Sequence, residues 1–367
     1  MTLIQSLKIG YVKVLLGIRR AVISTVQKCL FAPSTDPKKI LLHRIGTFGD
    51  SIVALPAISL IRKRYPDARM EFVTTYATAL NLSVIIKEGI FDAVHLIDKK
   101  SRKSGIQTLK HGNYDLYIEI PQNYGLIKTL RNMFITRFIL KIPSAFGWDE
   151  GMTKLFAKEQ LMFYPPLRES ERFVRNMARN GIVGGIDYPI KTETPQPEIL
   201  RCFGERKVIA LVIGTNVSAN MWPLESWQKL ARSLHEKGFA VAVIGGDQEK
   251  ERANTIVEGL EYGYNFCGAF SIAQSAGFLQ LCTGAICHDT GAMHLAYAVK
   301  TPLVALFSPR QLSSKWFPPE EGNSVVMNMV ECAGCFRKRC DDNICMKQID
   351  PVAVERRLLE MIGSSKQ

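Results

Sequence analysis

Short apolar runs alternate with glycine turns and amphipathic stretches along most of this chain. KILLHRIG (39–46) ends at a glycine, IVALPAISLIRKRY follows with apolar residues at helical spacing, and ARMEFVTT is a second apolar run. Short apolar runs bounded by turn residues predict buried strands, and longer runs at helical spacing predict helices. Strand, glycine turn, helix and strand in this order form a βαβ unit, so we expect a parallel sheet.

The same alternation starts again after a stretch rich in proline, glycine and charge at residues 184–207. VIALVIG (208–214) predicts a strand, WPLESWQKLARSLHEKG a helix and FAVAVIGG another strand, and GAICHD and PLVALFSP continue the series. We therefore expect an α/β protein with two doubly wound, Rossmann-like domains that face one another across a cleft. The expected boundaries are an N-terminal segment at 1–36, a first domain at 37–185, a linker at 186–207, a second domain at 208–349 and a terminal helix with its tail at 350–367.

The first 31 residues are apolar but carry basic residues throughout, at Lys8, Lys13, Arg19, Arg20 and Lys28. No uncharged run approaches the roughly 18 residues that a spanning helix needs, and the small-residue cleavage site of a signal peptide is absent. Two interpretations remain open. The segment is either a basic interfacial helix on anionic lipid or a helix that packs on its own protein.

The net charge and the number of cysteines indicate which partners the protein binds and in which compartment it lies. The formal net charge of +13 favours anionic partners such as nucleic acid, phosphates, acidic glycolipids or an anionic membrane. A nucleic-acid-binding protein would concentrate basic and aromatic residues in a recognisable module, whereas here the charge is spread along the βα units. The odd number of cysteines, nine, and the lack of a secretory pattern favour a reducing cytosol.

Four of the cysteines lie close together near the C-terminus, in the spacing Cys332-x2-Cys335-x4-Cys340-x4-Cys345. Four thiolates could hold a structural zinc ion. The later spacings are not those of a standard zinc finger, so unliganded or redox-active thiols are an equal alternative.

The turn RIGTFGDS (44–51) places Gly46, Gly49 and Asp50 between the first expected strand and helix. Glycines allow a ligand to approach the backbone closely. Asp50 is either the N-cap of the helix or a general base that accepts a proton from an attacking hydroxyl. The glycine spacing does not fit GxGxxG, so a dinucleotide fingerprint is not supported.

The motif HDTGAMHL (288–295) ends a strand and opens a helix, where free backbone N–H groups and the helix dipole favour an anion. Thr290 adds a hydroxyl, Gly291 removes steric bulk and His294 could add a donor, which together suit a pyrophosphate. The structural alternative makes Asp289 or Thr290 a cap and His294 a core histidine.

A second polar turn, TNVSANMWP (215–223), follows the strand VIALVIG. Thr215 and Asn216 could donate hydrogen bonds to phosphate oxygens, although turn chemistry alone explains them nearly as well.

These motifs together, in this order, resemble glycosyltransferase family 9, the lipopolysaccharide heptosyltransferases, over roughly residues 39–362. The resemblance implies a GT-B fold whose first domain mainly binds the acceptor and whose second binds the nucleotide-sugar. It also implies an inverting transfer, usually of heptose from ADP-heptose, that requires no metal or other cofactor. The implied acceptor is an acidic glycolipid, the lipopolysaccharide core, and the implied place of action is the cytoplasmic face of the cytoplasmic membrane.

The resemblance assigns the catalytic base to Asp50. The substrate-binding positions that we expect are Gly49, Thr215, Asn216, Asn220, Asp289, Thr290, Gly291, Ala292, Met293 and His294. Asn220 is a departure, because heptosyltransferases commonly carry a lysine there that neutralises the donor phosphate. Another cation could substitute, the donor could differ from ADP-heptose, or the chain could be a non-catalytic nucleotide-sugar-binding module.

Overall fold

The computed structural model describes residues 3–74, 85–97, 102–121, 124–149, 167–311 and 314–364. The chain divides into two compact units. Unit 1 comprises Met1–Pro189 together with Ser313–Lys315, and unit 2 comprises Ile190–Leu312 together with Trp316–Gln367.

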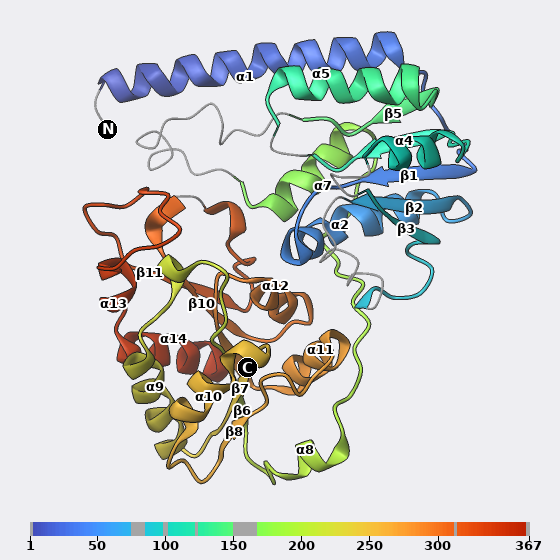
Figure 1. Ribbon diagram of the computed structural model, residues 1–367. Coiled ribbons are helices and arrows are strands. Elements are labelled where there is room, and N and C mark those ends of the chain that lie inside the picture. Colours follow the sequence, from blue (N-terminus) through green and yellow to red (C-terminus); the bar gives the residue numbers. More distant parts are fainter. Residues whose placement is uncertain are drawn as a thin grey trace. The chain divides into compact units, whose positions relative to one another are not determined.

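Unit 1 contains a parallel five-stranded sheet in the order β3-β2-β1-β4-β5 (Figure 1). Its strands are β1 (Lys39–His43), β2 (Arg69–Thr74), β3 (Ala93–Leu96), β4 (Leu116–Glu119) and β5 (Ser144–Phe146). The central strand β1 pairs on both sides, with Ile40 opposite Met70 of β2 and Leu116 of β4. Strands buried on both faces are apolar without alternation, which is the pattern of the run KILLH.

Helical segments in the described residues of unit 1 accompany this sheet. They are α1 (Leu3–Leu30), α2 (Phe48–Arg64), α4 (Arg102–Lys110), α5 (Leu126–Phe134), the π-helical turn η2 (Ile135–Ile139) and α7 (Glu169–Arg179). Helix α2 packs against α7, and its residues 49 and 51–61 are all buried. The near-complete burial of α2 explains why its sequence is apolar on all sides.

The predicted N-terminal helix forms, and one of its faces packs on unit 1. Ile9, Val12, Leu16 and Ile23 are buried along α1. The Arg20 Nε atom donates to the Asp149 Oδ1 atom at 2.9 Å and fixes the middle of the helix. This face therefore agrees with the interpretation that the segment packs on its own protein. No helix in the described residues combines the length and apolar character that a membrane span requires.

Unit 2 contains a parallel six-stranded sheet in the order β11-β10-β9-β6-β7-β8. Its strands are β6 (Val208–Val212), β7 (Ala240–Ile244), β8 (Gly263–Asn265), β9 (Gly284–His288), β10 (Leu303–Phe307) and β11 (Asn323–Met327). The α-helices are α8 (Pro197–Arg201), α9 (Leu224–Glu236), α10 (Lys250–Val257), α11 (Ile272–Leu281), α12 (Gly291–Ala298), α13 (Ile344–Lys347) and α14 (Pro351–Ser364). Four 3-10 turns complete the unit, η4 (Ser218–Asn220), η5 (Asp247–Glu249), η6 (Pro309–Gln311) and η7 (Ser314–Trp316), the last beginning in residues grouped with unit 1.

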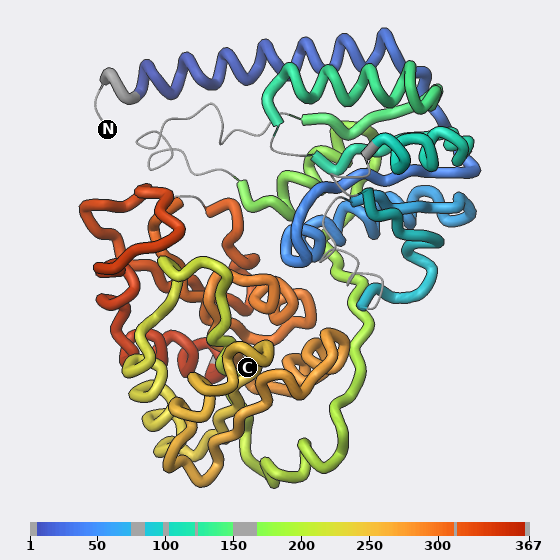
Figure 2. The backbone as a smooth tube through the Cα atoms, in the orientation of Figure 1, coloured from blue at the N-terminus to red at the C-terminus, as the bar shows by residue number. Residues whose placement is uncertain are grey.

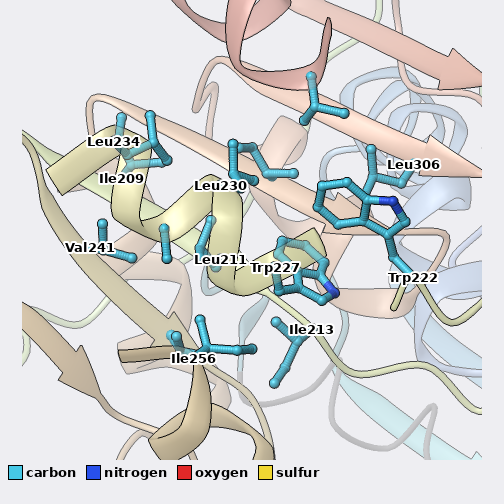
Figure 3. Packing of buried hydrophobic residues seen from close by; sticks show 14 of the residues in the cluster. Ile209, Leu211, Ile213, Trp222, Trp227, Leu230, Leu234, Val241, Ile256 and Leu306 are labelled. Carbon is cyan, nitrogen blue, oxygen red and sulfur yellow. The ribbon is translucent and has the colours of Figure 1, made fainter. Parts of the chain in front are cut away.

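The core of unit 2 lies between its sheet and helix α9 (Figure 3). Trp222 and Trp227 are almost fully buried and meet edge to face, with ring centroids 4.9 Å apart. The Trp222 Nε1 atom donates to the carbonyl of Ile349 at 3.0 Å, which satisfies its one polar atom. Val354 and Leu358 bring the terminal helix α14 into the same core.

The two parallel α/β sheets confirm the fold class predicted from the alternation of apolar runs. The predicted linker region contains one short helix, α8, which the tube in Figure 2 shows as a single short coil. The boundary between the units falls between residues 189 and 190. Asp350 precedes α14, and its Oδ1 atom accepts from the Val352 N–H at 3.1 Å, which caps the helix.

Candidate active site

Each unit has one place where its strand order reverses. In unit 1 this point lies between β1 and β4, and in unit 2 it lies between β6 and β9. Ligands of open parallel sheets bind beyond the carboxyl ends of the strands at such points. The turns that carry Asp50 and Thr290 follow β1 and β9, so each predicted centre lies at the reversal of its own unit.

Asp50 lies in the first turn of α2, three residues after the N-cap Thr47. The Asp50 Oδ2 atom accepts from the Thr47 N–H at 2.7 Å and from the Thr47 hydroxyl at 2.9 Å. The interpretation of Asp50 as the N-cap is therefore wrong, because Thr47 holds that position and Asp50 is the third helical residue. Two local hydrogen bonds therefore fix the Oδ2 atom of this half-buried carboxylate at the N-terminus of α2.

Gly46 makes room for that carboxylate. A Cβ atom at residue 46 would lie 2.4 Å from the Asp50 Cβ atom. The second glycine of the turn, Gly49, is buried at the start of α2. The turn RIGTFGDS thus needs a glycine at 46 for the packing of its own acid.

One buried and one half-buried arginine lie at this turn, Arg44 and Arg172. The Arg44 Nη1 atom and the Arg172 Nη2 atom donate to the carbonyl of Pro121, at 2.7 and 2.9 Å. Their guanidinium groups lie over the ring of Phe173, 4.5 and 4.9 Å from its centroid. Burial lowers the pKa of Arg44 to about 10, with the charge of Asp50 acting in the opposite direction, so Arg44 remains a cation at neutral pH.

A second acid lies at the neighbouring strand end. Glu119 ends β4, and its Oε2 atom accepts from the Nδ1 atom of His43, at the end of β1, at 2.7 Å. The Tyr117 hydroxyl donates to the same carboxylate oxygen. The buried Glu119 Oε1 atom has no hydrogen-bond partner in the part of unit 1 that the structure describes. Such an orphan acceptor at a sheet's ligand-binding edge is a candidate for contact with a substrate hydroxyl.

In unit 2, Thr290 is the N-cap of α12 and its Oγ1 atom accepts from the Met293 N–H at 3.4 Å. The first turn contains no acidic residue, and Gly291 and Ala292 are only half-buried. The N–H groups of this turn and the helix dipole favour an anion here. Asp289 lies just before the cap and is half-buried as well.

The predicted donor His294 has a buried ring. Its Nδ1 atom lies 2.9 Å from the Tyr297 hydroxyl, and its exposed fraction is 5%. Met293 is fully buried beside it. Both side chains take part in the packing of α12. We therefore expect residues 293 and 294 to contact a ligand through their backbone atoms.

His288 ties the two polar turns of unit 2 together. Its Nε2 atom accepts from the Trp222 N–H at 2.9 Å, and its Nδ1 atom lies 3.0 Å from the Ile213 carbonyl. Burial is the main cause that lowers the pKa of His288 to about 3, so the ring is neutral and Nδ1 carries the hydrogen. The end of β9 thereby holds both ends of the turn that follows β6.

That turn presents Thr215, Asn216 and Asn220. The Thr215 Oγ1 atom accepts from the Val217 N–H at 3.3 Å, and Asn216 is exposed. Asn220 has an exposed fraction of 4%, and its Oδ1 atom has no hydrogen-bond partner among the residues that the structure describes. A buried amide that lacks a partner is costly unless a ligand satisfies it.

The chain matches the family model described as "Glycosyltransferase family 9 (heptosyltransferase)" over residues 102–344. The chain belongs to glycosyltransferase family 9. Lipopolysaccharide heptosyltransferase 1 of Pseudomonas aeruginosa is 27% identical to it over 331 residues, which cover 82% of this chain and 87% of the relative.

Solved structures show the same fold. The E. coli ADP-heptose lps heptosyltransferase II has a TM-score of 0.64 at 20% identity, over 90% of this chain and all of that chain. The E. coli heptosyltransferase WaaC with ADP-2-deoxy-2-fluoro heptose has a TM-score of 0.61 at 20% identity, over 88% of this chain and 99% of that one. This glycosyltransferase therefore has the GT-B fold class predicted from its sequence.

The cysteine-rich segment of this glycosyltransferase supports the turn after β6. The Lys338 carbonyl accepts from the Ala219 N–H and the Ser218 hydroxyl, both at 3.2 Å. The Asn343 side-chain amide donates to the Met221 carbonyl at 2.8 Å. The cysteine-rich segment is therefore hydrogen-bonded to the polar turn 215–223, and it carries the basic run 337–339 next to that turn.

The geometry does not support the predicted zinc site at the four cysteines. No group of three or more His, Cys, Asp and Glu side chains in the described residues is placed to hold a metal ion. Cys345 Sγ lies 3.3 Å from the Ser308 hydroxyl, and Cys340 Sγ accepts from the Asn343 N–H at 3.3 Å. At least two of the thiols thus have local hydrogen-bond partners rather than one another, and all four are free.

The structure groups the predicted residues of unit 2 at one sheet edge and places Gly49 and Asp50 at the corresponding edge of unit 1. It adds residues that the sequence analysis missed, namely His43, Arg44, Glu119, Arg172 and His288. A signal was present for some of them, because His43, Arg44 and Glu119 are charged or polar residues at the ends of apolar strands. Arg172 comes from a distant helix, and nothing in the local sequence indicates its contact.

Proposed function

We propose that this glycosyltransferase transfers heptose from ADP-heptose to a lipopolysaccharide core acceptor by a single inverting displacement. The names of the curated relatives, lipopolysaccharide heptosyltransferases, support the proposed acceptor. A solved structure with a similar fold contains an ADP-heptose analogue, which supports the proposed donor. We place the reaction at the cytoplasmic face of the cytoplasmic membrane, where such a glycolipid acceptor would be anchored.

Asp50 is the proposed general base. An acceptor hydroxyl attacks the anomeric carbon of the heptose, Asp50 takes the hydroxyl proton, and the bond to the diphosphate breaks on the opposite face of the sugar. The observation that carries this role is the fixed carboxylate at the N-terminus of α2, held by Thr47 and given room by Gly46. Arg44 supplies a nearby cation, whose own pKa the charge of Asp50 raises against the effect of burial.

The proposed site of the leaving ADP is the turn that opens α12. Backbone N–H groups after Thr290 and the positive end of the helix dipole would stabilise the charge that grows on the diphosphate. Thr215, Asn216, Asn220 and Asp289 lie on the two turns joined by His288 and would complete the phosphate and sugar contacts. In this mechanism no metal ion is required.

Asn220 favours a second candidate, a donor other than ADP-heptose. An amide can donate to a phosphate but cannot neutralise its charge. Heptosyltransferases commonly have a lysine at this place in the turn, and this chain has Asn220 instead. A donor with another sugar or nucleotide would fit the family equally.

A donor screen tests the proposal. The purified protein is mixed with deacylated core oligosaccharide and with ADP-heptose, ADP-glucose, UDP-glucose or GDP-mannose, and the product mass is measured by mass spectrometry. A product heavier by one heptose residue, formed only with ADP-heptose, is expected. A hexose-sized increase with another donor establishes the second candidate, and donor binding by calorimetry without any product establishes a non-catalytic binding module.

A further inference from the structure

The outward face of α1 carries a stripe of apolar residues. Ile9, Val12, Leu16 and Ile23 face the protein, while a second apolar set recurs at helical spacing on the other side. The members of this second set are Leu7, Tyr11, Val14, Ile18 and Val22, with exposed fractions of 66, 68, 63, 56 and 37%. An α-helix that packs on its own protein needs only one apolar face, so the second stripe calls for a separate explanation.

The neighbouring helical segment has an apolar outward face too. Helix α5 lies beside α1 within unit 1, and η2 continues it (Figures 1 and 2). Ile127, Phe134, Phe138 and Ile139 are exposed there, and the rings of Phe134 and Phe138 lie 4.7 Å apart. The two helical segments together carry nine of the sixteen large hydrophobic residues that are exposed in the described part of the chain. Single exposed hydrophobic residues are ordinary, but a cluster of this kind marks an interaction surface.

The charge of the two segments identifies the chemistry of the partner. Residues 3–30 and 126–141 contain nine lysines and arginines and no aspartate or glutamate. On α1, Lys8 and Lys28 are exposed on different sides of the apolar stripe, and on α5, Lys128 and Arg131 are exposed beside Ile127. An apolar face with aromatic residues and flanking basic residues is the pattern of a helix that lies in the plane of an anionic bilayer surface.

The alternative occupants fit this surface less well. A second copy of the chain would bring two sets of exposed basic residues together, and like charges across an interface are costly. A membrane span is unsuitable because basic residues recur through α1. A helix of 28 residues is about 42 Å long and can lie along a bilayer over its full length.

We propose that the outward faces of α1 and of α5 with η2 form one membrane-docking surface for anionic phospholipid. The exposed apolar residues enter the boundary between headgroups and acyl chains, and the basic residues contact the headgroups. The inference rests on the proposed function only for its biological role, which is to bring the enzyme to a membrane-anchored acceptor.

Vesicle co-sedimentation of the full chain tests the proposal. One double variant changes α1 (Tyr11→Glu with Ile18→Glu), and the other changes α5 and η2 (Phe134→Glu with Phe138→Glu). The matched control, Val183→Glu with Val352→Glu, makes the same change of charge at two exposed hydrophobic residues outside the surface. Vesicles contain phosphatidylcholine alone or with about a third phosphatidylglycerol.

We expect the wild type to bind anionic vesicles at least tenfold more strongly than neutral ones, with weaker binding in about 0.5 M KCl. Each surface double variant lowers the partition coefficient at least tenfold, and the control stays within about twofold of wild type. Circular dichroism and sedimentation velocity establish that each variant is folded and report its oligomeric state. Wild-type binding by both surface variants, or no wild-type binding to anionic vesicles, overturns the proposal. Dimers that these substitutions dissociate, without vesicle binding, assign the surface to a second copy instead.

A second measurement separates failure of the docking surface from failure of the proposed function. Transfer to a deacylated, soluble acceptor is measured for the same variants without vesicles, and it is expected to equal that of the wild type. Lost vesicle binding with retained transfer supports the docking surface alone. Vesicle binding by a wild-type protein that transfers no sugar contradicts the proposed function and leaves the docking surface in place.

Discussion

The position of the Asp50 side chain depends on the neighbouring glycine, Gly46. The Asp50 carboxylate reaches back to Thr47, and this path brings its Cβ atom against the backbone of Gly46. The close approach, rather than an unusual backbone angle, explains the need for glycine at this position. The position of the proposed base is therefore sensitive to a single methyl group.

Gly46→Ala is expected to reduce kcat about 10²-fold, because it displaces the carboxylate from its position. Donor affinity, which we assign to unit 2, should change by less than about twofold. The control Gly185→Ala adds the same methyl group in unit 1 where no atom lies within 4 Å. Steady-state kinetics and calorimetry with ADP measure the two quantities, and a loss of ADP affinity equal to the loss of kcat would contradict this role.

His288 makes the stability of unit 2 dependent on pH. The folded pKa is about 3, below the ordinary value of 6.5, because the ring is buried. The unfolded chain therefore binds a proton below pH 6.5 that the folded chain does not bind. The stabilisation is present above pH 6.5 and is lost as the pH falls toward 3.

The free energy of unfolding should fall with a slope on the order of 1 kcal/mol per pH unit from pH 6 to 4 on account of His288. His288→Gln should flatten this slope and lower stability at pH 7, since it disturbs the contacts to Trp222 and Ile213. His235→Gln, at a half-buried histidine of α9, is the control and should keep the slope. Urea unfolding at several pH values measures the slope, and equal slopes in wild type and His288→Gln would refute the assignment.

We assign different roles to two helix N-termini of unit 2. Ser271 caps α11 through a hydrogen bond from the Gln274 N–H at 3.1 Å, and Thr290 caps α12 through the Met293 N–H. Both caps stabilise a helix, but only the cap of α12 lies at the point where the strand order reverses. The two helices thus allow the structural and binding contributions of a cap to be separated.

Thr290→Ala and Ser271→Ala should each lower stability by about 0.5–2 kcal/mol. Only Thr290→Ala should also weaken ADP binding, by about tenfold or more, because a hydroxyl contact with a charged phosphate is lost. Thermal unfolding and calorimetry with ADP make the comparison. Equal ADP affinity in the two variants would place the diphosphate elsewhere.

The elements were predictable where burial imposes a simple pattern. LVALF is buried along its whole length and VIALV at all but its first residue, so their sequences are uninterrupted apolar runs. The short strands β8 and β11 are only half-buried, and their mixed sequences GYN and NSVVM carry no comparable signal. The polar turns at the strand ends were predictable because glycine, aspartate and threonine there have specific backbone functions.

Contacts between distant segments were not predictable. The pairing of His43 with Glu119 requires β1 and β4 to be neighbours, although β2 and β3 intervene in the sequence. Arg172 reaches the carbonyl of Pro121 from α7, 51 residues away. His288 lies in a run that predicts only a strand, and its function follows from its contacts with the turn after β6.

We propose that the two units have different tasks in sugar transfer. We attribute proton removal to unit 1 and the departing diphosphate to unit 2, and both tasks use protein groups alone. Transfer should therefore retain its full rate after extensive dialysis against EDTA. Atomic absorption before and after dialysis reports any metal at the cysteine segment, and a rate that falls with removal and returns with one added metal would contradict the metal-free mechanism.

The most direct test of the account is the single-turnover rate of sugar transfer by Asp50→Asn at saturating donor, with Asp36→Asn as an exposed control in unit 1. The account predicts a rate about 10² to 10⁴-fold below wild type for Asp50→Asn, because the amide cannot accept the proton of the acceptor hydroxyl. Asp36→Asn should match the wild type. A rate for Asp50→Asn within threefold of wild type would show that another group removes the proton.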